Sequence, residues 1–176
     1  MDHPNPSFDP KDFRNALGMF ATGVTIVTAR ADDGSPIGIT ANSFNSVSLQ
    51  PPMVLWSLAK SARSLSIFSK SKHWNVHVLS NDQDALSNRF ARAGEDKFAG
   101  LELDACVSGA PLIPGCSARF QCRTAFQYDG GDHIIFVGEV INYDSSALPP
   151  LLYVTGNYAL ASRKAAAIST EPQANV

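Results

Sequence analysis

The feature that most constrains the fold is a long segment of alternating side chains between Cys116 and Gln127. A period of two is typical of a strand with one buried and one polar face. Asp129-Gly130-Gly131-Asp132 can then turn the chain, and residues 134–141 form a second apolar extended run. The pattern predicts a long antiparallel hairpin, with one core-facing row made of Cys116, Ala118, Phe120, Cys122, Thr124 and Phe126.

Shorter strands and three helices are expected around this hairpin. The β-branched run 24–28, the turn 32–34 and the extended run 36–39 predict a second hairpin, and residues 53–58 and 74–79 have strand length and composition. Helices are expected after Asp9-Pro10, after a cap at Ser61, and over 82–92. Their apolar stripes, which we interpret as packing surfaces, are Phe13, Leu17 and Phe20; Ala62, Leu65 and Phe68; and Leu86 and Phe90.

Many strands with few helices favour a mainly β fold, an antiparallel barrel with peripheral helices, over an alternating β-α-β sheet. The chain has no G-x-G-x-x-G sequence, so a Rossmann cofactor domain is not expected. We expect one domain over residues 9–161, followed by a frayed polar tail over 162–176.

Composition excludes several classes of protein. The chain has 176 residues, of which 44% are hydrophobic, enough for one buried core. A net charge of −2 argues against a nucleic-acid-binding protein. Without a signal sequence or an apolar run of about 18 residues, we expect a soluble cytoplasmic protein with no membrane partner. The spacing of Cys106, Cys116 and Cys122 predicts reduced thiols and no metal site.

Three segments could carry chemistry. Residues 38–48 are rich in hydroxyl and amide side chains that could surround a polar heterocycle, or could serve only the turns of their own loop. Residues 61–64 place two hydroxyls and a guanidinium where a phosphate could bind, although an ordinary helix cap would look similar. His133 follows a hairpin turn, where it could face a cleft or only solvent.

Six stretches in one order resemble the flavin reductase-like domain family, the reductase components of two-component flavin monooxygenases. They are FRNALGMFATGVTIVTA, GITANSFNSVSLQPPMVLWSL, SARSLSIF, HVLSNDQDALSNRFA with DKFAG after it, GGDHIIFVGEV and PLLYVTGNYA. The resemblance covers roughly residues 13–160. It implies a split, Greek-key β-barrel that forms a homodimer, with FMN or FAD bound near the subunit boundary and NADH or NADPH as the hydride donor.

The resemblance also implies roles for individual residues. It places His133 over the flavin, where the nicotinamide stacks, and assigns the flavin phosphate to Ser61, Arg63 and Ser64. The remaining implied cofactor contacts are Thr40, Ala41, Asn42, Ser43, Phe44, Ser46, Val47, Ser57, Arg89, Phe90, Tyr153, Thr155, Gly156 and Tyr158. Many members of the family that the chain resembles have Arg where this chain has Thr155, so the resemblance leaves the choice between NADH and NADPH open.

The implied activity is an NAD(P)H-dependent flavin reductase that supplies reduced flavin to a separate oxygenase by diffusion. Hydride transfer between two cofactors needs no catalytic dyad, which agrees with the lack of a nucleophile or paired-carboxylate motif. Two alternatives remain open: a flavin-binding or flavin-sensing protein without turnover, and an oxidase of a related barrel acting on pyridoxamine phosphate. The second would need more phosphate-binding cations than residues 61–64 supply.

Overall fold

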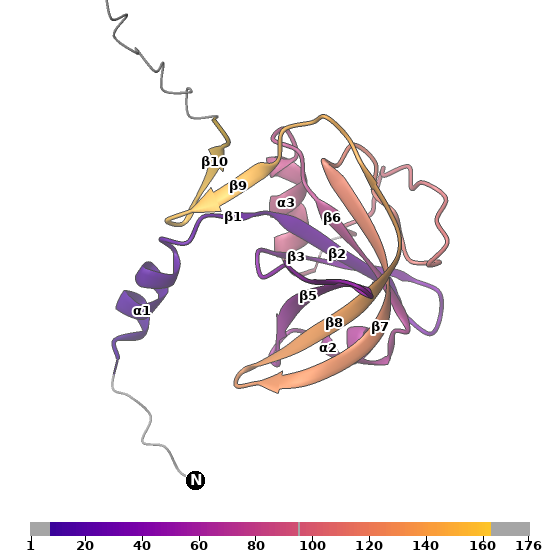
Figure 1. Ribbon diagram of the computed structural model, residues 1–176, viewed down its shortest axis with the longest axis horizontal. Coiled ribbons are helices and arrows are strands. Elements are labelled where there is room, and N and C mark those ends of the chain that lie inside the picture. Colours follow the sequence, from indigo (N-terminus) through magenta and orange to yellow (C-terminus); the bar gives the residue numbers. More distant parts are fainter. Residues whose placement is uncertain (1–7, 95, 163–176) are drawn as a thin grey trace, which may run out of the picture.

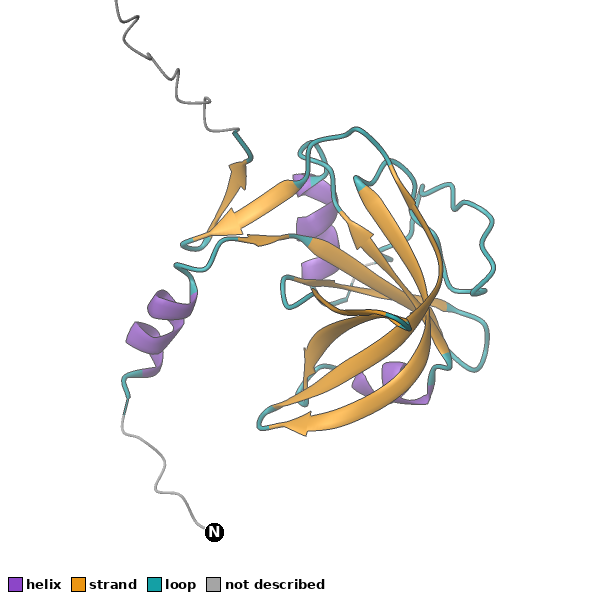
Figure 2. Cartoon of the chain, in the orientation of Figure 1, coloured by secondary structure: helices purple, strands orange, loops and turns teal. Residues whose placement is uncertain are grey.

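The computed structural model describes residues 8–94 and 96–162, in which a strongly curved sheet dominates (Figures 1 and 2). Seven strands follow the order β3-β2-β6-β7-β8-β5-β4, and a separate small sheet has the order β1-β9-β10. Every strand pair is antiparallel. The strands are β1 Thr22–Gly23, β2 Thr25–Arg30, β3 Pro36–Ala41, β4 Asn45–Leu49, β5 Pro52–Ala59, β6 His73–Val78, β7 Ala118–Gly130, β8 His133–Ser145, β9 Leu151–Val154 and β10 Asn157–Leu160.

The predicted fold class is confirmed, because the sheet curls into a barrel that stays split. Its two edge strands are β3 and β4, which are consecutive in the chain. Side chains bridge from the end of β3 toward β5: the Ser43 hydroxyl donates to the Ser57 carbonyl at 3.0 Å, and the Ser57 N–H donates back to Ser43 Oγ at 2.9 Å. Because β3 is first in the strand order, its outer edge is unpaired within the sheet, which matters for the site.

The long hairpin is present, with Gly130 paired to His133 across the turn. The predicted core-facing row is confirmed at Cys116 and Cys122, which are buried, but is wrong at Phe126, which is 51% exposed; Gln121, predicted on the polar face, is buried. Ala125 has no partner between the pairs Thr124–Gly138 and Phe126–Val137, so this β-bulge shifts the alternation by one residue. Gln121 is buried because its side-chain oxygen accepts the backbone N–H groups of residues 107 and 108.

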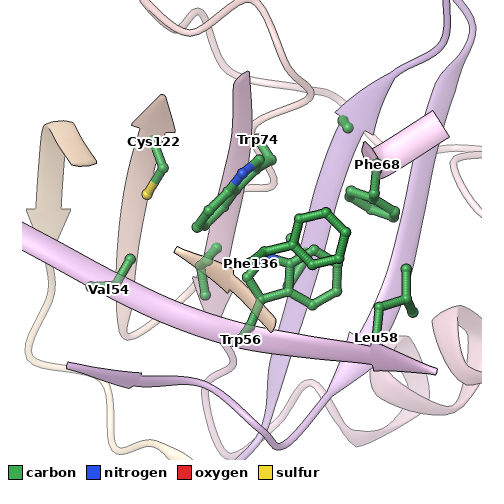
Figure 3. Close-up of a cluster of buried hydrophobic side chains, with 10 residues drawn as sticks. Val54, Trp56, Leu58, Phe68, Trp74, Cys122 and Phe136 are labelled. Atoms are coloured by element: carbon green, nitrogen blue, oxygen red, sulfur yellow. The ribbon is translucent and has the colours of Figure 1, made fainter. Parts of the chain in front are cut away.

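Aromatic rings fill the barrel. Trp56 of β5 stacks on Phe136 of β8 with ring centroids 4.9 Å apart, and the edge of the Phe68 ring meets Trp56 at 4.9 Å (Figure 3). Trp74 lies against Gly138, where a Cβ atom would overlap the indole ring. A second cluster, which includes Ile26, Leu79, Phe90 and Ile113, packs between the sheet and α3.

The helices differ from expectation in two ways. They are α1 Pro10–Leu17, α2 Leu65–Lys70 and α3 Asp84–Ala91. Asp9 caps α1 as predicted, but the stripe of Phe13, Leu17 and Phe20 is 52–74% exposed, because α1 stands away from the barrel (Figure 1). The predicted Ser61 cap is also wrong: tight turns occupy residues 59–65, and Ser64 precedes the first residue of α2.

The described residues contain no helix long and apolar enough to cross a membrane. The three cysteines form no disulfide, and burial raises the pKa of both Cys116 and Cys122 to about 12. These two thiols are therefore protonated and unreactive at neutral pH. Of the predicted tail over 162–176, residues 163–176 lie outside the described residues.

Candidate functional site

A ring-sized pocket of about 440 Å³ lies between the end of β3, one face of α3 and the β9–β10 hairpin. We call it the ring pocket. The lining contains no Asp, Glu, His, Lys or Arg, and its side chains include hydroxyl, amide and phenol groups. The lining residues are Val24, Thr40, Ala41, Asn42, Ser87, Asn88, Ala91, Tyr153, Gly156, Asn157 and Tyr158. Such a lining suits a planar, polar heterocycle.

Hydrogen bonds hold the three walls of the ring pocket together. The Thr40 hydroxyl of β3 donates to the Ser87 carbonyl of α3 at 2.7 Å. From β10, the Tyr158 hydroxyl lies 2.9 Å from Ser87 Oγ and 3.0 Å from Asn88 Oδ1. The pocket is thus built before any ligand binds, which favours binding of a rigid ring.

The β9–β10 turn connects this pocket to α1. Thr155 and Gly156 both have positive φ, 49° and 82°, as a tight two-residue hairpin turn requires. The Thr155 N–H donates to the carbonyl of Gly18, the residue that ends α1, at 2.8 Å. The position of α1 therefore bears directly on one wall of the ring pocket.

A second pocket of about 400 Å³ continues along β3, and we call it the basic pocket. Residues 36–39 line the basic pocket, and the next residues along the strand and after it, 40–42, line the ring pocket. Ala91 lines both pockets. Its charged side chains are the cations Arg63, Arg92 and Lys97 and one carboxylate, Asp96, with Ser64 beside them. Among residues 8–94 and 96–162, none of these three cations forms an ion pair, so they are available to an anion.

Lys97 marks the junction of the two pockets. Its ammonium donates to the Gly38 carbonyl of β3 at 3.1 Å and to the Phe90 carbonyl of α3 at 2.7 Å. Burial lowers the pKa of Lys97 below its usual value. Because the Gly38 carbonyl points to the open edge of β3, the backbone groups of Thr40, two residues on, face the same edge. A bound ligand could pair with them.

The structure brings together only part of the predicted set. Six predicted residues line the ring pocket: Thr40, Ala41, Asn42, Tyr153, Gly156 and Tyr158. Arg63 and Ser64 line the basic pocket. Lining neither pocket are Ser43, Phe44, Ser46, Val47, Ser57, Ser61, Arg89, Phe90, Thr155 and His133.

Several residues outside the pockets have structural contacts of their own. Ser43 and Ser57 bond to each other, and Phe44 stacks on Phe120 at 5.5 Å. Arg89 donates to the Ala99 carbonyl at 3.1 Å. Phe90 is fully buried beneath β3, so its side chain shapes the site from behind.

His133 lies at the hairpin tip, beside the loop that leads to the basic pocket. It pairs with Ala59 of β5, and the neighbouring Asp132 carbonyl accepts the Lys60 N–H at 2.8 Å. His133 Nδ1 is 2.7 Å from the Asp132 carboxylate, a hydrogen bond that lowers the pKa of Asp132.

Sequence reasoning missed Ser87 and Asn88 of α3, Asn157 of β10, and the cations Arg92 and Lys97. A signal for α3 was present: Ser87 and Ala91 are four residues apart, so two small side chains share one helix face where a ligand or strand can approach closely. The pocket cations gave no such signal, because a loop brings them to β3.

Known proteins share both the sequence and this geometry. The family model described as "Flavin reductase like domain" matches residues 17–162. The chain belongs to the flavin reductase-like domain family. It is 51% identical over 154 residues to FMN reductase (NADH) SmoA of Agrobacterium fabrum, covering 88% of this chain and 87% of that protein.

Other relatives of this flavin reductase-like chain are named for monooxygenase systems or for the other flavin. The reductase component of the flavin-dependent trigonelline monooxygenase of Acinetobacter baylyi is 43% identical, over 84% of this chain and 48% of that protein. The Streptomyces globisporus NADH:FAD oxidoreductase SgcE6, solved with NAD and FAD fragments, is 36% identical, with a TM-score of 0.83 over 92% of this chain and all of that one.

Gly38 permits the close approach of α3 to β3, and a side chain there should disturb the site. A Cβ atom at Gly38 would lie 2.5 Å from Phe90 Cε1 and 3.3 Å from Phe98 Cζ. We expect Gly38→Ala to destabilise the fold by about 1–3 kcal/mol, as overpacking does, and to weaken flavin binding by moving α3. Urea unfolding and flavin titration measure the two effects. Gly23→Ala is a suitable control, because no atom lies within 4 Å of the Cβ position at Gly23. Gly34→Ala is not, because the positive φ of Gly34 would itself strain an alanine.

Proposed function

We propose that this chain oxidises NADH, transfers the hydride to FMN or FAD, and releases the reduced flavin to a separate flavin-dependent oxygenase by diffusion. The observation that carries the proposal is the continuity of a neutral, ring-sized pocket with a basic pocket along the open edge of β3. This combination matches a heterocycle joined to a phosphate. Relatives named as NADH-dependent flavin reductases and as monooxygenase components support the reaction and the partner.

In this proposal the flavin ring lies in the ring pocket against residues 40–42, and its phosphate lies against Arg63 and Ser64. The bound flavin supplies the hydride-accepting chemistry, with the nicotinamide as donor. The chain's own task is to hold the two rings in contact and to keep water out. Tyr153 and Tyr158 of the small sheet, whose rings are 5.7 Å apart, form the outer wall at which the nicotinamide would enter.

The absence of charge in the ring pocket bears on the electron donor. NADPH differs from NADH by a 2′-phosphate, which proteins commonly bind with arginine. No cationic side chain lines the ring pocket, and the β9–β10 turn beside it has the uncharged Thr155. We therefore propose NADH as the donor. Steady-state oxidation of NADH and NADPH by the purified protein, with added flavin, tests this choice.

We also propose that the chain works as a homodimer, because α1 exposes an apolar face that its own chain does not cover. No residue of α1 is buried, and Phe13, Leu17, Met19 and Phe20 are all more than half exposed (Figure 1). A single amphipathic helix standing in water is unstable without a packing partner. A second copy of the chain supplies one.

The dimer prediction has a direct test. We expect twice the chain mass by light scattering, and Leu17→Asp with Phe20→Asp should shift the protein toward the monomer. The double variant should also lose flavin reductase activity, because the Gly18–Thr155 hydrogen bond connects α1 to the ring pocket. A monomeric wild-type protein with full activity would refute the proposal. Arg14→Asp on the same helix is a matched control for added negative charge.

From the family resemblance we propose that His133, which lines neither pocket, orients the nicotinamide, with Asp132 holding the imidazole. His133→Ala should lower the rate of flavin reduction at least about tenfold, which corresponds to about 1.4 kcal/mol. Flavin affinity should stay within a few-fold, since the contacts of both pockets remain. Stopped-flow reduction beside flavin titration separates the two. A wild-type rate of flavin reduction in His133→Ala would show that His133 is a solvated turn residue with no part in the reaction.

A further inference from the structure

The β9–β10 hairpin, the outer wall of the ring pocket, is attached to the barrel through its backbone at one end only. Where β9 begins, the Leu151 N–H donates to the Leu79 carbonyl at 2.9 Å, and the Leu151 carbonyl accepts the Val24 N–H at 3.1 Å. Beyond Leu151 the hairpin leaves the barrel beside α3, with β10 as its exposed outer strand (Figure 1). The far end of the hairpin therefore needs another contact to stay in place.

One side chain joins that far end to the barrel. The Tyr158 hydroxyl of β10 reaches Ser87 Oγ at 2.9 Å and Asn88 Oδ1 at 3.0 Å, both on α3. Within residues 8–94 and 96–162, these are the only side-chain hydrogen bonds that residues 152–160 make outside their own hairpin. The hairpin turn also bonds Gly18, but α1 stands away from the barrel and does not press the hairpin onto α3 (Figure 1).

The three groups satisfy one another only as a chain of hydrogen bonds. A phenol has one hydrogen and an amide oxygen can only accept, so Tyr158 donates to Asn88 Oδ1 and accepts from the Ser87 hydroxyl. Ser87 is 1% exposed, and its hydroxyl has no other hydrogen-bond partner in the described part of the chain. Because a buried hydroxyl without a partner is costly, Ser87 favours the closed position of the hairpin.

We propose that Tyr158 is a positioning residue: as a latch between β10 and α3, it holds the β9–β10 hairpin closed over the ring pocket and limits how fast flavin leaves. This inference rests on the proposed function, because a reductase that releases its flavin must open one wall of the pocket in every cycle. The other two walls, β3 and α3, are joined by the Thr40–Ser87 bond and by Lys97, so the hairpin is the wall that opens.

Tyr158→Phe removes the hydroxyl of the latch and keeps the aromatic wall. In the flavin-free protein, hydrogen–deuterium exchange of the amides that pair β9 with β10 should become about fivefold to tenfold faster, as expected for the loss of a neutral hydrogen bond. Amides of β6, at the centre of the large sheet, should be unchanged and report on the fold as a whole. Ser87→Ala should act in the same direction, and the effects of the two variants combined should be less than additive.

Flavin dissociation, followed by stopped-flow fluorescence, should also be about fivefold to tenfold faster in Tyr158→Phe. The change should be equal for riboflavin, FMN and FAD, because the latch closes the ring pocket and does not line the basic pocket. Reduction of bound flavin at saturating NADH should change less than about twofold, the reverse of the pattern expected for His133→Ala. Tyr143→Phe, which removes the same hydroxyl from an exposed tyrosine outside both pockets, is the matched control.

Two results would overturn the latch. Faster flavin release with unchanged exchange in the flavin-free protein would mean that Tyr158 contacts the flavin directly, and unchanged release would mean that the hairpin does not control it. If Tyr158→Phe also accelerates exchange in β6, Ser87→Ala decides by the same two readouts. Exchange and dissociation use no NADH, so a chain that binds flavin without oxidising NADH would refute the proposed function and leave the latch standing.

Discussion

Arg63→Ala should weaken the binding of both FMN and FAD by roughly 10- to 150-fold. A guanidinium that pairs with a phosphate contributes about 1.5–3 kcal/mol, and 1.4 kcal/mol is about tenfold in affinity. Arg63 lines the basic pocket, is exposed, and forms no ion pair within the described residues, so removing it should leave the fold unchanged. Flavin fluorescence titration measures the affinity.

Riboflavin provides the internal control for Arg63, because it has the same ring and no phosphate. Its affinity should change less than twofold in Arg63→Ala, and Lys72→Ala should leave all three flavins unchanged. An equal loss for riboflavin and FMN would mean that Arg63 shapes the pocket without touching the phosphate. Unchanged affinity for every flavin would place the phosphate elsewhere.

Lowering the pH from 7 to 5 should cost the fold about 2 kcal/mol through His77 alone. This residue is fully buried: Nδ1 lies 2.9 Å from the Ile26 carbonyl, and Nε2 accepts the Ile113 N–H at 3.0 Å. Burial lowers the pKa of His77 from 6.5 to about 4. Between these values the unfolded chain binds a proton that the folded chain rejects, so stability is lost as pH falls from 6.5 toward 4.

Replacing His77 with glutamine isolates this effect, because an amide retains one donor and one acceptor but does not titrate. Urea unfolding at pH 7 and pH 5 should show a smaller pH-dependent loss for His77→Gln than for wild type, by about 2 kcal/mol. Carboxylates elsewhere respond equally in both proteins and cancel. Identical pH dependence of the two proteins would show that His77 is not the group responsible.

Local patterns predicted the strands β2, β3, β5, β6, β7 and β8, because the causes of those strands are local. They did not predict the strands β1, β4, β9 and β10. The long hairpin follows from the alternation of side chains and from the Asp129–Asp132 turn. The bulge at Ala125 was not predicted, because the sequence of one strand does not show how it pairs with the neighbouring strand. The stripe of α1 was read correctly as apolar. The surface that covers the stripe was not predicted correctly. An apolar stripe has the same sequence pattern whether it packs against its own chain or against another chain.

The site likewise has residues that the sequence predicted and residues that it did not. Thr40, Asn42 and Arg63 stood in stretches whose composition already suggested a ligand, and they line the pockets. Ser43 stood in the same stretch but bonds Ser57 instead, because the split barrel needs a bridge at that point. Arg92 and Lys97 reach the site only through the loop after α3, a long-range placement that composition does not reveal.

The most direct test of the central claim measures NADH oxidation by the purified protein with and without added flavin. Cytochrome c, separated from the protein by a dialysis membrane, takes the place of the oxygenase and reports reduced flavin that has left the protein. The account predicts that NADH is consumed only when FMN or FAD is added, and that the cytochrome on the far side is reduced by flavin that has left the protein. Flavin binding without NADH oxidation would contradict the account and favour a flavin-sensing protein. Rapid NADH oxidation with no reduction across the membrane would contradict release by diffusion.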